Sequence, residues 1–259
     1  MATRKATKVS KELRGSRVKF RFRRHVLPIM AGLVMFIAIF LLLNSQLISG
    51  VIAYQLYSKR VNVATADAAT SGYPVDPSAP PRIIINKINV TAPVNFTETR
   101  VNQYIFLQDL HDGTVHYPGT ALPGQTGNIV IFGHSSGVWW EPGHYKFVFT
   151  LLDQLTYGDK IFVEYKGVRY IYQVYNTMVV QPDNMSVLNQ TGNHMLTLIT
   201  CTPVGTSAKR LIIQAQQISP KVPDGTGYGA PATLPSTAQG QSALPSSDAS
   251  LWDALRHLF

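Results

Sequence analysis

The sequence contains one cysteine, Cys201, which ends a strand-like apolar run over 194–200 and is followed by a loop with proline and glycine. A thiol at the point where a strand gives way to such a loop lies at a sheet edge, open to a ligand on one side. Nine residues later, Arg210 begins a second apolar run, so a short loop can bring a fixed positive charge back to the sulfur. These residue types suit nucleophilic catalysis, in which a thiolate attacks a carbonyl group and a cation stabilises the oxyanion.

A thiol nucleophile also needs a group that moves a proton, and His134 is the best placed of the seven histidines. It lies in the sequence Phe-Gly-His-Ser-Ser-Gly, directly after a buried apolar run over 128–133. This position mirrors that of Cys201 at the end of its own run. We therefore expect the imidazole and the thiol to meet at one edge of a sheet.

Two plainer interpretations stay open. A single cysteine is most often a small buried apolar residue. A metal site is the second alternative, with ligands drawn from His111, His116, His134, Glu141 and His144. No ligand spacing typical of a metal site stands out, so we expect neither a metal nor another cofactor.

The formal net charge of +9 is confined to one end of the chain. Residues 1–25 hold ten of the 23 Lys and Arg residues and a single acid, Glu12, so the remaining 13 bases and 13 acids balance. A neutral remainder offers no basic surface for nucleic acid, and we exclude nucleic acid as a partner. Residues 1–25 are predicted to form a basic cytoplasmic segment.

An apolar stretch follows the basic segment. Residues 26–43 carry no charge, and weaker apolar character continues to residue 54. A helix needs about 20 apolar residues to cross a bilayer, and flanking cations stay in the cytoplasm. We predict a single transmembrane signal-anchor helix over 26–54, with the remainder of the chain outside the cell. A cleaved signal peptide is the alternative, although its apolar region is usually about 7–15 residues long.

The exported part divides by composition into a linker over 55–81, a folded domain over 82–219 and a tail over 220–259. The tail is rich in Pro, Gly, Ser, Thr and Ala, which is typical of disorder, and it ends in a short amphipathic helical pattern. In the folded domain, strands are predicted over 82–90, 92–96, 128–133, 194–200 and 210–218, with a hairpin over 160–182. A short helix is predicted over 149–159, and a short helix or an irregular segment over 101–110. Many short strands bounded by turn residues favour a β-sandwich or a barrel.

The sequence Thr-Leu-Ile-Thr-Cys over 197–201 resembles the Thr-Leu-x-Thr-Cys signature of the sortases, membrane-anchored cysteine transpeptidases of bacterial surfaces. Residues 210–213 are similar to the following strand, which begins with the essential arginine of the family. Residues 128–134 are similar to the strand and loop that deliver its histidine. With two further matches upstream, the resemblance covers nearly all of 82–218.

The resemblance implies a mainly β fold, a closed eight-stranded barrel with short helices, preceded by the one transmembrane helix. It implies that Cys201 is the nucleophile, that His134 acts as general acid and then base, and that Arg210 holds the oxyanion or the substrate. The implied substrates are exported proteins with a sorting motif of the Leu-Pro-x-Thr-Gly type, and the acceptor is an amine of the cell wall or of a pilin.

The resemblance also implies a peptide groove. Thr200 is expected to contact the substrate or the oxyanion, and the loop over 181–193, with Val187 and Leu188, is expected to form one wall. Pilin-building members commonly carry an Asp-Pro-aromatic lid, whereas here Ser78 follows Asp76 and Pro77. A general surface-anchoring role is therefore preferred.

The tail contains Leu-Pro-Ser-Thr-Ala from Leu234 to Ala238, which is similar to the motif that such enzymes cut. Chance occurrence in a tail of this composition is the simpler explanation, and a self-interaction as pseudosubstrate or substrate is our hypothesis. Two rival functions also stay open: an exported cysteine peptidase, and a non-catalytic extracellular β-barrel binding module in which Cys201 only packs. A papain-like peptidase has its histidine downstream of the cysteine, where this chain has only His257.

Overall fold

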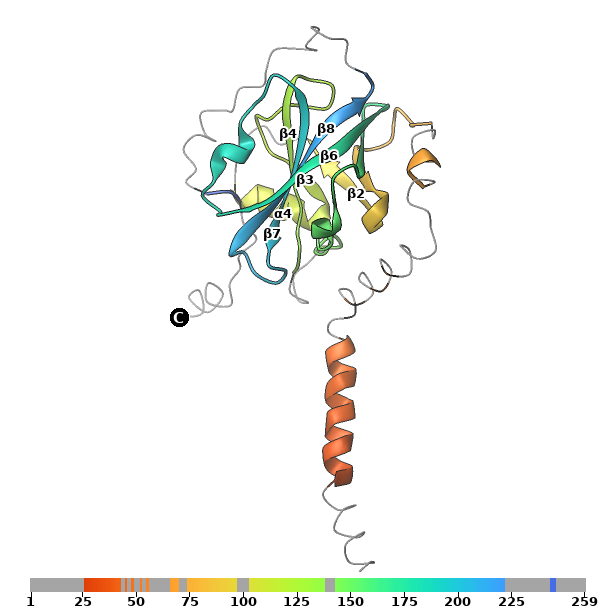
Figure 1. The fold of residues 1–259 in the computed structure, drawn as a ribbon. Helices are drawn as coiled ribbons and strands as arrows, with labels where there is room; N and C mark the ends of the chain where they lie inside the picture. The colour runs from red at the N-terminus through yellow and green to blue at the C-terminus, as the bar shows by residue number, and fades with distance from the viewer. Residues whose placement is uncertain are drawn as a thin grey trace, which may run out of the picture. The chain divides into compact units, whose positions relative to one another are not determined.

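The computed structural model describes residues 26–42, 66–69, 74–96, 103–137, 143–221 and 243–245, together with single positions between 45 and 55. In the described part, eight strands close into a barrel in the order β1-β2-β3-β4-β7-β8-β6-β5, and β5 pairs back onto β1 (Figure 1). The strands are β1 (Arg82–Ile85), β2 (Val90–Asn95), β3 (Thr114–His116), β4 (Gly127–Phe132), β5 (Lys160–Tyr165), β6 (Val168–Val180), β7 (His194–Thr202) and β8 (Lys209–Ser219). The predicted mainly β, closed eight-stranded barrel is confirmed.

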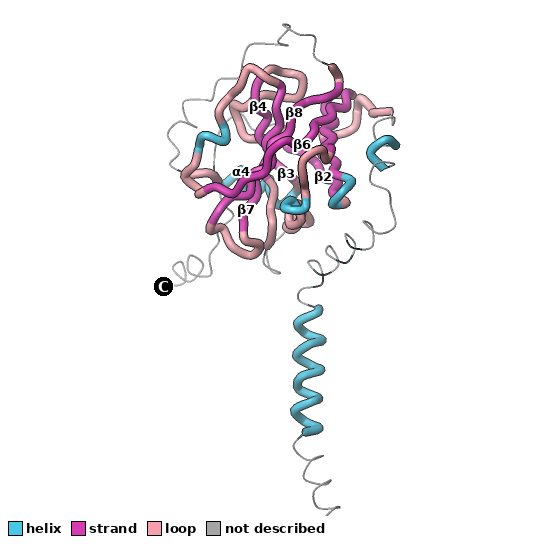
Figure 2. Tube along the Cα trace, viewed as in Figure 1, coloured by secondary structure: helices cyan, strands magenta, loops and turns pink. Residues whose placement is uncertain are grey.

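Helical structure in the barrel domain is sparse. Among its described residues, one α-helix, α4 (Gln103–Asp112), and three short 3-10 helices, η1 (Asn86–Ile88), η2 (Leu152–Gln154) and η3 (Met185–Leu188), lie in the connections between strands (Figure 2). The segment over 101–110, predicted as a short helix or an irregular stretch, corresponds to α4.

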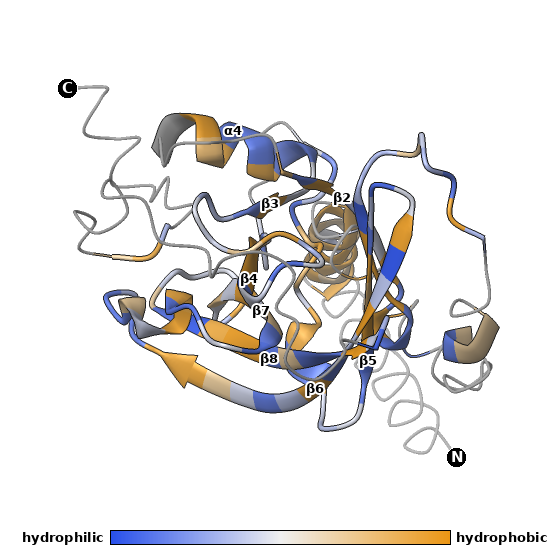
Figure 3. Cartoon of the chain, turned by 90° about the horizontal axis from the view of Figure 1, so that it is seen from above, coloured by the Kyte–Doolittle hydropathy of each residue, from blue (hydrophilic) through white to orange (hydrophobic). Residues whose placement is uncertain are grey.

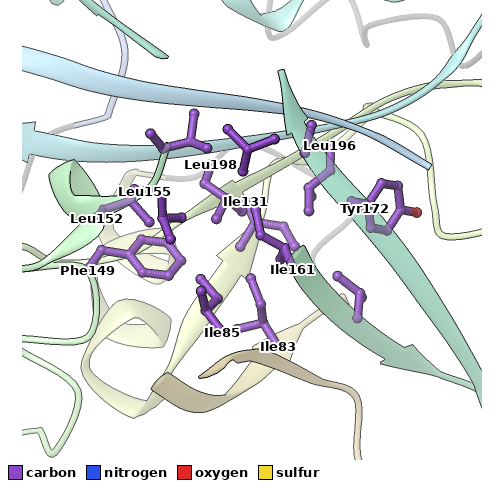
Figure 4. Packing of buried hydrophobic residues seen from close by; sticks show 14 of the residues in the cluster. Ile83, Ile85, Ile131, Phe149, Leu152, Leu155, Ile161, Tyr172, Leu196 and Leu198 are labelled. Atoms are coloured by element: carbon purple, nitrogen blue, oxygen red, sulfur yellow. The ribbon is translucent and has the colours of Figure 1, made fainter. Parts of the chain in front are cut away.

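The inside of the barrel is filled by aliphatic and aromatic side chains (Figure 4). Ile129 and Ile131 of β4, Leu196 and Leu198 of β7, and Ile213 of β8 are at most 1% exposed and belong to this inner cluster. Every second residue of a strand points to the same face, so these positions define the inward face of the three strands.

A second apolar cluster covers the outer face of the same strands. Val130, Phe132, Ile199 and Ile212 alternate with the inner positions, and α4 lies over them (Figure 3). The ring of Phe106 on α4 packs edge-on against Phe132, with centroids 5.3 Å apart. β4, β7 and β8 are thus buried on both faces, which explains why they appear in the sequence as continuous apolar runs.

The predicted strand over 82–90 is interrupted. Residues 86–88 form η1, and Asn89 adopts a left-handed conformation with φ 53° before β2 begins. Asparagine tolerates this conformation better than most residues, so it permits a tight turn between two strands. The Ile-rich run is therefore the β1–β2 hairpin rather than one strand.

The predicted helix over 149–159 is wrong. Its apolar residues Phe149, Leu152 and Leu155 are spaced by three, which is the period of a 3-10 helix, and only Leu152–Gln154 is helical. All three side chains are at most 2% exposed and enter the barrel interior.

The predicted hairpin over 160–182 is confirmed by the pairing of β5 with β6. Lys166 and Gly167 at its turn both have positive φ, as a tight hairpin turn requires.

Part of the segment predicted as a linker lies against the barrel. The amide of Asn86 donates to Asp67 at 3.0 Å, and Pro77 lies beside the hairpin turn at Gly167. Gly167 directly precedes β6, whose other end is Val180, and Val180 pairs with Arg210. A strand of 13 residues spans about 40 Å, so the Asp76-Pro77-Ser78 segment lies far from Arg210.

The chain divides into two compact units, Met1–Ser49 and Gly50–Phe259. In the first unit, residues 26–42 form a helix whose apolar side chains are largely exposed, with Leu27 at 69% and Leu42 at 74%. Within the described part of the chain, no helix reaches the combination of length and apolar character needed to cross a membrane. Most of the remainder of the predicted 26–54 span lies outside the described residues.

Candidate active site

The ends of β4 and β7 bring the predicted histidine and cysteine together. These strands run parallel with Phe132 opposite Ile199, and the Gly133 amide continues the ladder by donating to the Ile199 carbonyl at 3.1 Å. His134 and Cys201 each lie two residues beyond this pair. The register therefore places both residues at the same end of two adjacent strands, His134 in the loop that follows β4 and Cys201 near the end of β7.

Arg210 completes the group from the next strand. In the antiparallel β7–β8 ladder, Cys201 is directly opposite Arg210. The residues two positions further into the strands, Ile199 and Ile212, belong to the outer cluster, so Cys201 and Arg210 share the outer face of the barrel. Cys201 is partly exposed, as a nucleophile must be to meet a substrate.

The guanidinium of Arg210 is buried but bound to carbonyl groups rather than to an acid. It is 2% exposed and donates from Nη1 to the carbonyls of Ser207, at 2.8 Å, and Lys209, at 3.1 Å. Its Nε has no hydrogen-bond partner in the part of the chain that the structure describes, where no salt bridge involves Arg210. A buried cation without an anion is costly, and a carbonyl or oxyanion ligand would satisfy it.

His134 is held in a neutral state. Its side chain is 6% exposed and its ring stacks on that of His111, with centroids 5.9 Å apart. Burial, and to a lesser extent repulsion from His111 and Lys146, lowers the pKa of His134 to about 4. Its Nε2 has no hydrogen-bond partner among the described residues. A neutral imidazole with an unused ring nitrogen can accept a proton at neutral pH.

The loop that carries His134 is fixed from two sides. The Thr200 hydroxyl donates to the Gly133 carbonyl at 2.8 Å, and the His134 carbonyl accepts from the Phe149 amide at 2.9 Å. Thr200 is 3% exposed, so its hydroxyl serves this internal bond. The prediction that Thr200 contacts the substrate stays a prediction, and the position of its side chain favours support of the His134 loop.

Val187 and Leu188 lie in η3 within the outer cluster. Val187 is 5% exposed and Leu188 is 0% exposed, and the Val187 carbonyl accepts from the side-chain amide of Asn128 at 3.0 Å. Asn128 in turn accepts from the Thr197 hydroxyl at 2.7 Å. This chain of hydrogen bonds ties the 181–193 loop to β4 and β7. Substrate contact by Val187 and Leu188 stays a prediction.

The residues considered as metal ligands do not converge. His111 and His134 are stacked, and His116 is 4% exposed with Nε2 bonded to the Thr120 hydroxyl and the Ala121 carbonyl. Among the described residues, no group of three His, Cys, Asp or Glu side chains could hold a metal ion. Glu141 lies outside the described residues.

Sequence reasoning misses three residues near the site: His111, Lys146 and Leu244. His111 and Lys146 reach the site because α4 and the 143–151 segment fold over the end of β4, and no local pattern in the sequence signals this. Leu244 lies in the tail, where its neighbour Pro245 makes a Leu-Pro pair like that at Leu234. The Leu234–Ala238 segment of our hypothesis lies outside the described residues.

Comparison with known proteins shows the family of this chain. A model of the sortase domain matches residues 83–218, and the chain belongs to the sortase family. Sortase D of Bacillus subtilis (strain 168) is 30% identical over 115 residues, which cover 43% of this chain and 53% of that relative. The chain thus matches only about half the length of this curated relative.

Two solved structures are also similar. Sortase C1 of Streptococcus agalactiae, in complex with MTSET, is 30% identical with a TM-score of 0.44, covering 55% of this chain and 68% of its own. Sortase C from Clostridium perfringens SM101 is 26% identical with a TM-score of 0.43, covering 56% and 70% respectively.

The protonation state of His134 can be measured by NMR titration of its ring. We expect a midpoint near pH 4, and His111→Phe, which keeps an aromatic ring but removes the ionisable group, should raise it by less than about one unit because burial dominates. His144→Phe replaces an exposed histidine outside the stack and should leave the midpoint unchanged. A wild-type midpoint near 6.5 would contradict the buried, neutral imidazole.

The close packing behind His134 predicts the effect of a methyl group at Gly133. A Cβ there would lie 2.4 Å from the ring of Phe149, which is fully buried, so Gly133→Ala should lower the free energy of unfolding by about 1–3 kcal/mol. Chemical denaturation measures this. Gly192→Ala is the matched control, since no atom lies within 4 Å of its Cβ position. Equal stability of the two variants would contradict this expectation and would show that the loop with Gly133 can move to accommodate a methyl group.

Proposed function

We propose that this chain is a membrane-anchored sortase-type cysteine transpeptidase. It cleaves a Leu-Pro-x-Thr-Gly type motif in exported proteins and transfers the acyl group to an amine at the cell surface. The observation that carries the proposal is the position of Arg210, which is directly opposite Cys201 in the β7–β8 ladder and is buried without a salt bridge among the described residues. His134 lies at the same end of the strands, and its Nε2 has no hydrogen-bond partner among the described residues. Family membership supports the same chemistry.

In the first half-reaction, the sulfur of Cys201 attacks the carbonyl carbon of the threonine in the motif. Because His134 is neutral at rest, its Nε2 accepts the thiol proton as the C–S bond forms. Arg210 stabilises the oxyanion with a charge that persists at any physiological pH. His134 then gives its proton to the departing amine of glycine, and a thioester remains on Cys201.

In the second half-reaction, an acceptor amine attacks the thioester carbonyl. His134, neutral again, takes the proton from the attacking nitrogen, and the Cys201 sulfur leaves with the proton returned to it. Each step restores the charge of the site. Transfer to an amine rather than to water distinguishes a transpeptidase from the rival exported hydrolase.

A general surface-anchoring role is the preferred subtype. In this chain Ser78 replaces the aromatic residue of the pilin-type lid, and Pro77 lies beside Gly167 at the far end of β6 from Arg210. The Asp76-Pro77-Ser78 segment therefore does not cover the sulfur. The proposed substrates are exported proteins with sorting motifs, and the proposed acceptor is an amine of the cell wall.

The test is ligation of a labelled Leu-Pro-x-Thr-Gly peptide to a glycine-based amine, followed by mass spectrometry. Cys201→Ala should abolish the product, and Arg210→Lys, which keeps the charge but loses the planar fork, should lower kcat/KM by about 10²-fold or more. Lys209→Gln changes the exposed neighbour of Arg210 and should retain activity. Cleavage of the peptide that does not depend on the amine would favour the hydrolase. A Cys201 that does not react with the peptide would favour the binding module.

We also propose that the chain spans the membrane once, with the basic 1–25 segment in the cytoplasm and the barrel outside. The exposed apolar helix over 26–42 supports this topology. Alkaline washing of membranes should leave the full chain in the pellet, and external protease should remove the barrel domain. Leu33→Asp combined with Ile37→Asp should shift the chain to the soluble fraction, since each buried charge costs about 2.5–3.5 kcal/mol. Release of the unaltered chain would contradict the anchor.

A further inference from the structure

A short piece of the C-terminal tail, Ala243–Pro245, lies against the candidate active site. Leu244 is only 2% exposed and belongs to the outer apolar cluster, together with Val187, Leu188 and Ile212. Burial of a leucine side chain contributes about 1.5–3 kcal/mol relative to its exposed state. The tail thus has a defined apolar contact next to the start of β8, where Arg210 and Ile212 lie.

The backbone of Leu244 is also bound. Its amide donates to the Pro182 carbonyl at 2.6 Å, and its carbonyl accepts from Nη2 of Arg210 at 3.4 Å. Arg210 is the residue opposite Cys201, and its guanidinium is the group that we assign to the substrate or oxyanion. The tail therefore uses a hydrogen-bond donor that the transpeptidation needs.

The sequence of the docked segment has the chemistry of the proposed substrate. Residues 243–247 are Ala-Leu-Pro-Ser-Ser, which share leucine, proline and a small polar residue with the Leu-Pro-x-Thr motif. A leucine buried beside η3 and a carbonyl on Arg210 form a site for an extended peptide with an apolar residue before proline. Ser247 stands at the threonine position and Asp248 follows in place of glycine, so this segment departs from the motif at the bond that is cut.

The chain length allows the tail to dock on its own domain. Leu244 follows Lys221, which is close to the end of β8, by 23 residues. An extended chain of that length reaches about 75 Å, which is more than twice the length of β8, the strand that separates Lys221 from Arg210. Because the segment is covalently linked to the barrel, its docking is intramolecular, and an effective concentration of roughly millimolar makes weak contacts sufficient for occupancy.

We propose that Leu244 and Pro245 are an intramolecular pseudosubstrate that occupies the peptide groove beside Cys201 and competes with sorting motifs. This regulation rests on the proposed function of the same site. An intramolecular competitor leaves kcat unchanged, and the apparent dissociation constant for substrate equals the intrinsic constant divided by the fraction of open protein. The enzyme is then restrained until a substrate at high local concentration displaces the tail.

The test uses the full chain with the background substitution Cys201→Ala, so that binding is measured without turnover. The probe is a fluorescent peptide, Ala-Leu-Pro-Ser-Thr-Gly, followed by polarisation. Leu244→Ala should lower its Kd about five-fold if the tail is docked four-fifths of the time. Leu234→Ala, the matched change in the other Leu-Pro pair of the tail, should leave Kd unchanged. Equal Kd values for Leu244→Ala and the parent chain would overturn the proposal.

Alkylation of Cys201 by iodoacetamide in the otherwise unaltered chain separates this inference from the proposed function. Leu244→Ala should speed labelling relative to both the parent and Leu234→Ala, and the melting temperature should show that the barrel stays folded. Faster labelling of Leu244→Ala without any peptide ligation would contradict the proposed transpeptidase function but would support the contact between the tail and the site. If Leu244→Ala ligates the peptide with the same KM as the parent chain, the transpeptidase function is supported and the pseudosubstrate proposal is contradicted.

Discussion

The site depends on the parallel register between β4 and β7. Six residue pairs, from Gly127 with His194 to Phe132 with Ile199, fix how far each strand extends before His134 and Cys201 are reached. A slip of one residue would turn every side chain of a strand to the other face and would send one of the two groups into the barrel interior. Burial of both faces of β4 and β7 makes such a slip costly, because every side chain would leave the neighbours against which it packs and meet a cluster of different shape.

Polar contacts reinforce the same register. The Thr197 hydroxyl reaches the side chain of Asn128 across the two strands, and the Thr200 hydroxyl reaches the Gly133 carbonyl. Buried hydroxyls without a partner are costly, so both threonines select the one alignment in which they are bonded. The two threonines of the Thr-Leu-Ile-Thr-Cys sequence therefore have a structural function: their hydrogen bonds fix the register of β7, and thus the position of Cys201, relative to β4 and the loop that carries His134. This physical role is separate from any contact with substrate.

The sequence predicts the barrel and the site because its local signals agree with the global fold. Apolar runs mark the doubly buried strands, the Lys166-Gly167 turn marks a hairpin, and Cys201 and His134 stand at strand ends. The three-residue β3, Thr114–His116, is not among the predicted strands, because so short a strand carries no readable alternation. The burial of the Thr200 hydroxyl and the stacking of His111 on His134 arise from tertiary packing alone.

The tail shows a different limit. A Leu-Pro pair in a segment of low complexity is easily explained by composition, and of the two such pairs in the tail only the one at Leu234 is followed by the threonine of the motif. The structure shows Leu244 in contact with the guanidinium of Arg210 and with the apolar cluster that includes η3, whereas Leu234 lies outside the described residues.

The charges around the site explain why proton transfer and anion stabilisation can be divided between two residues. Burial near His111 and Lys146 disfavours the imidazolium form of His134, so this residue rests as a base. Arg210, whose guanidinium stays charged even when buried, keeps a full positive charge opposite Cys201 in the same strand pair. In the mechanism that we propose, a group that cannot lose its proton would therefore stabilise the developing oxyanion, while the proton would move through the imidazole of His134. The same fixed charge attracts any backbone carbonyl that reaches the groove, whether it belongs to a substrate or to Leu244.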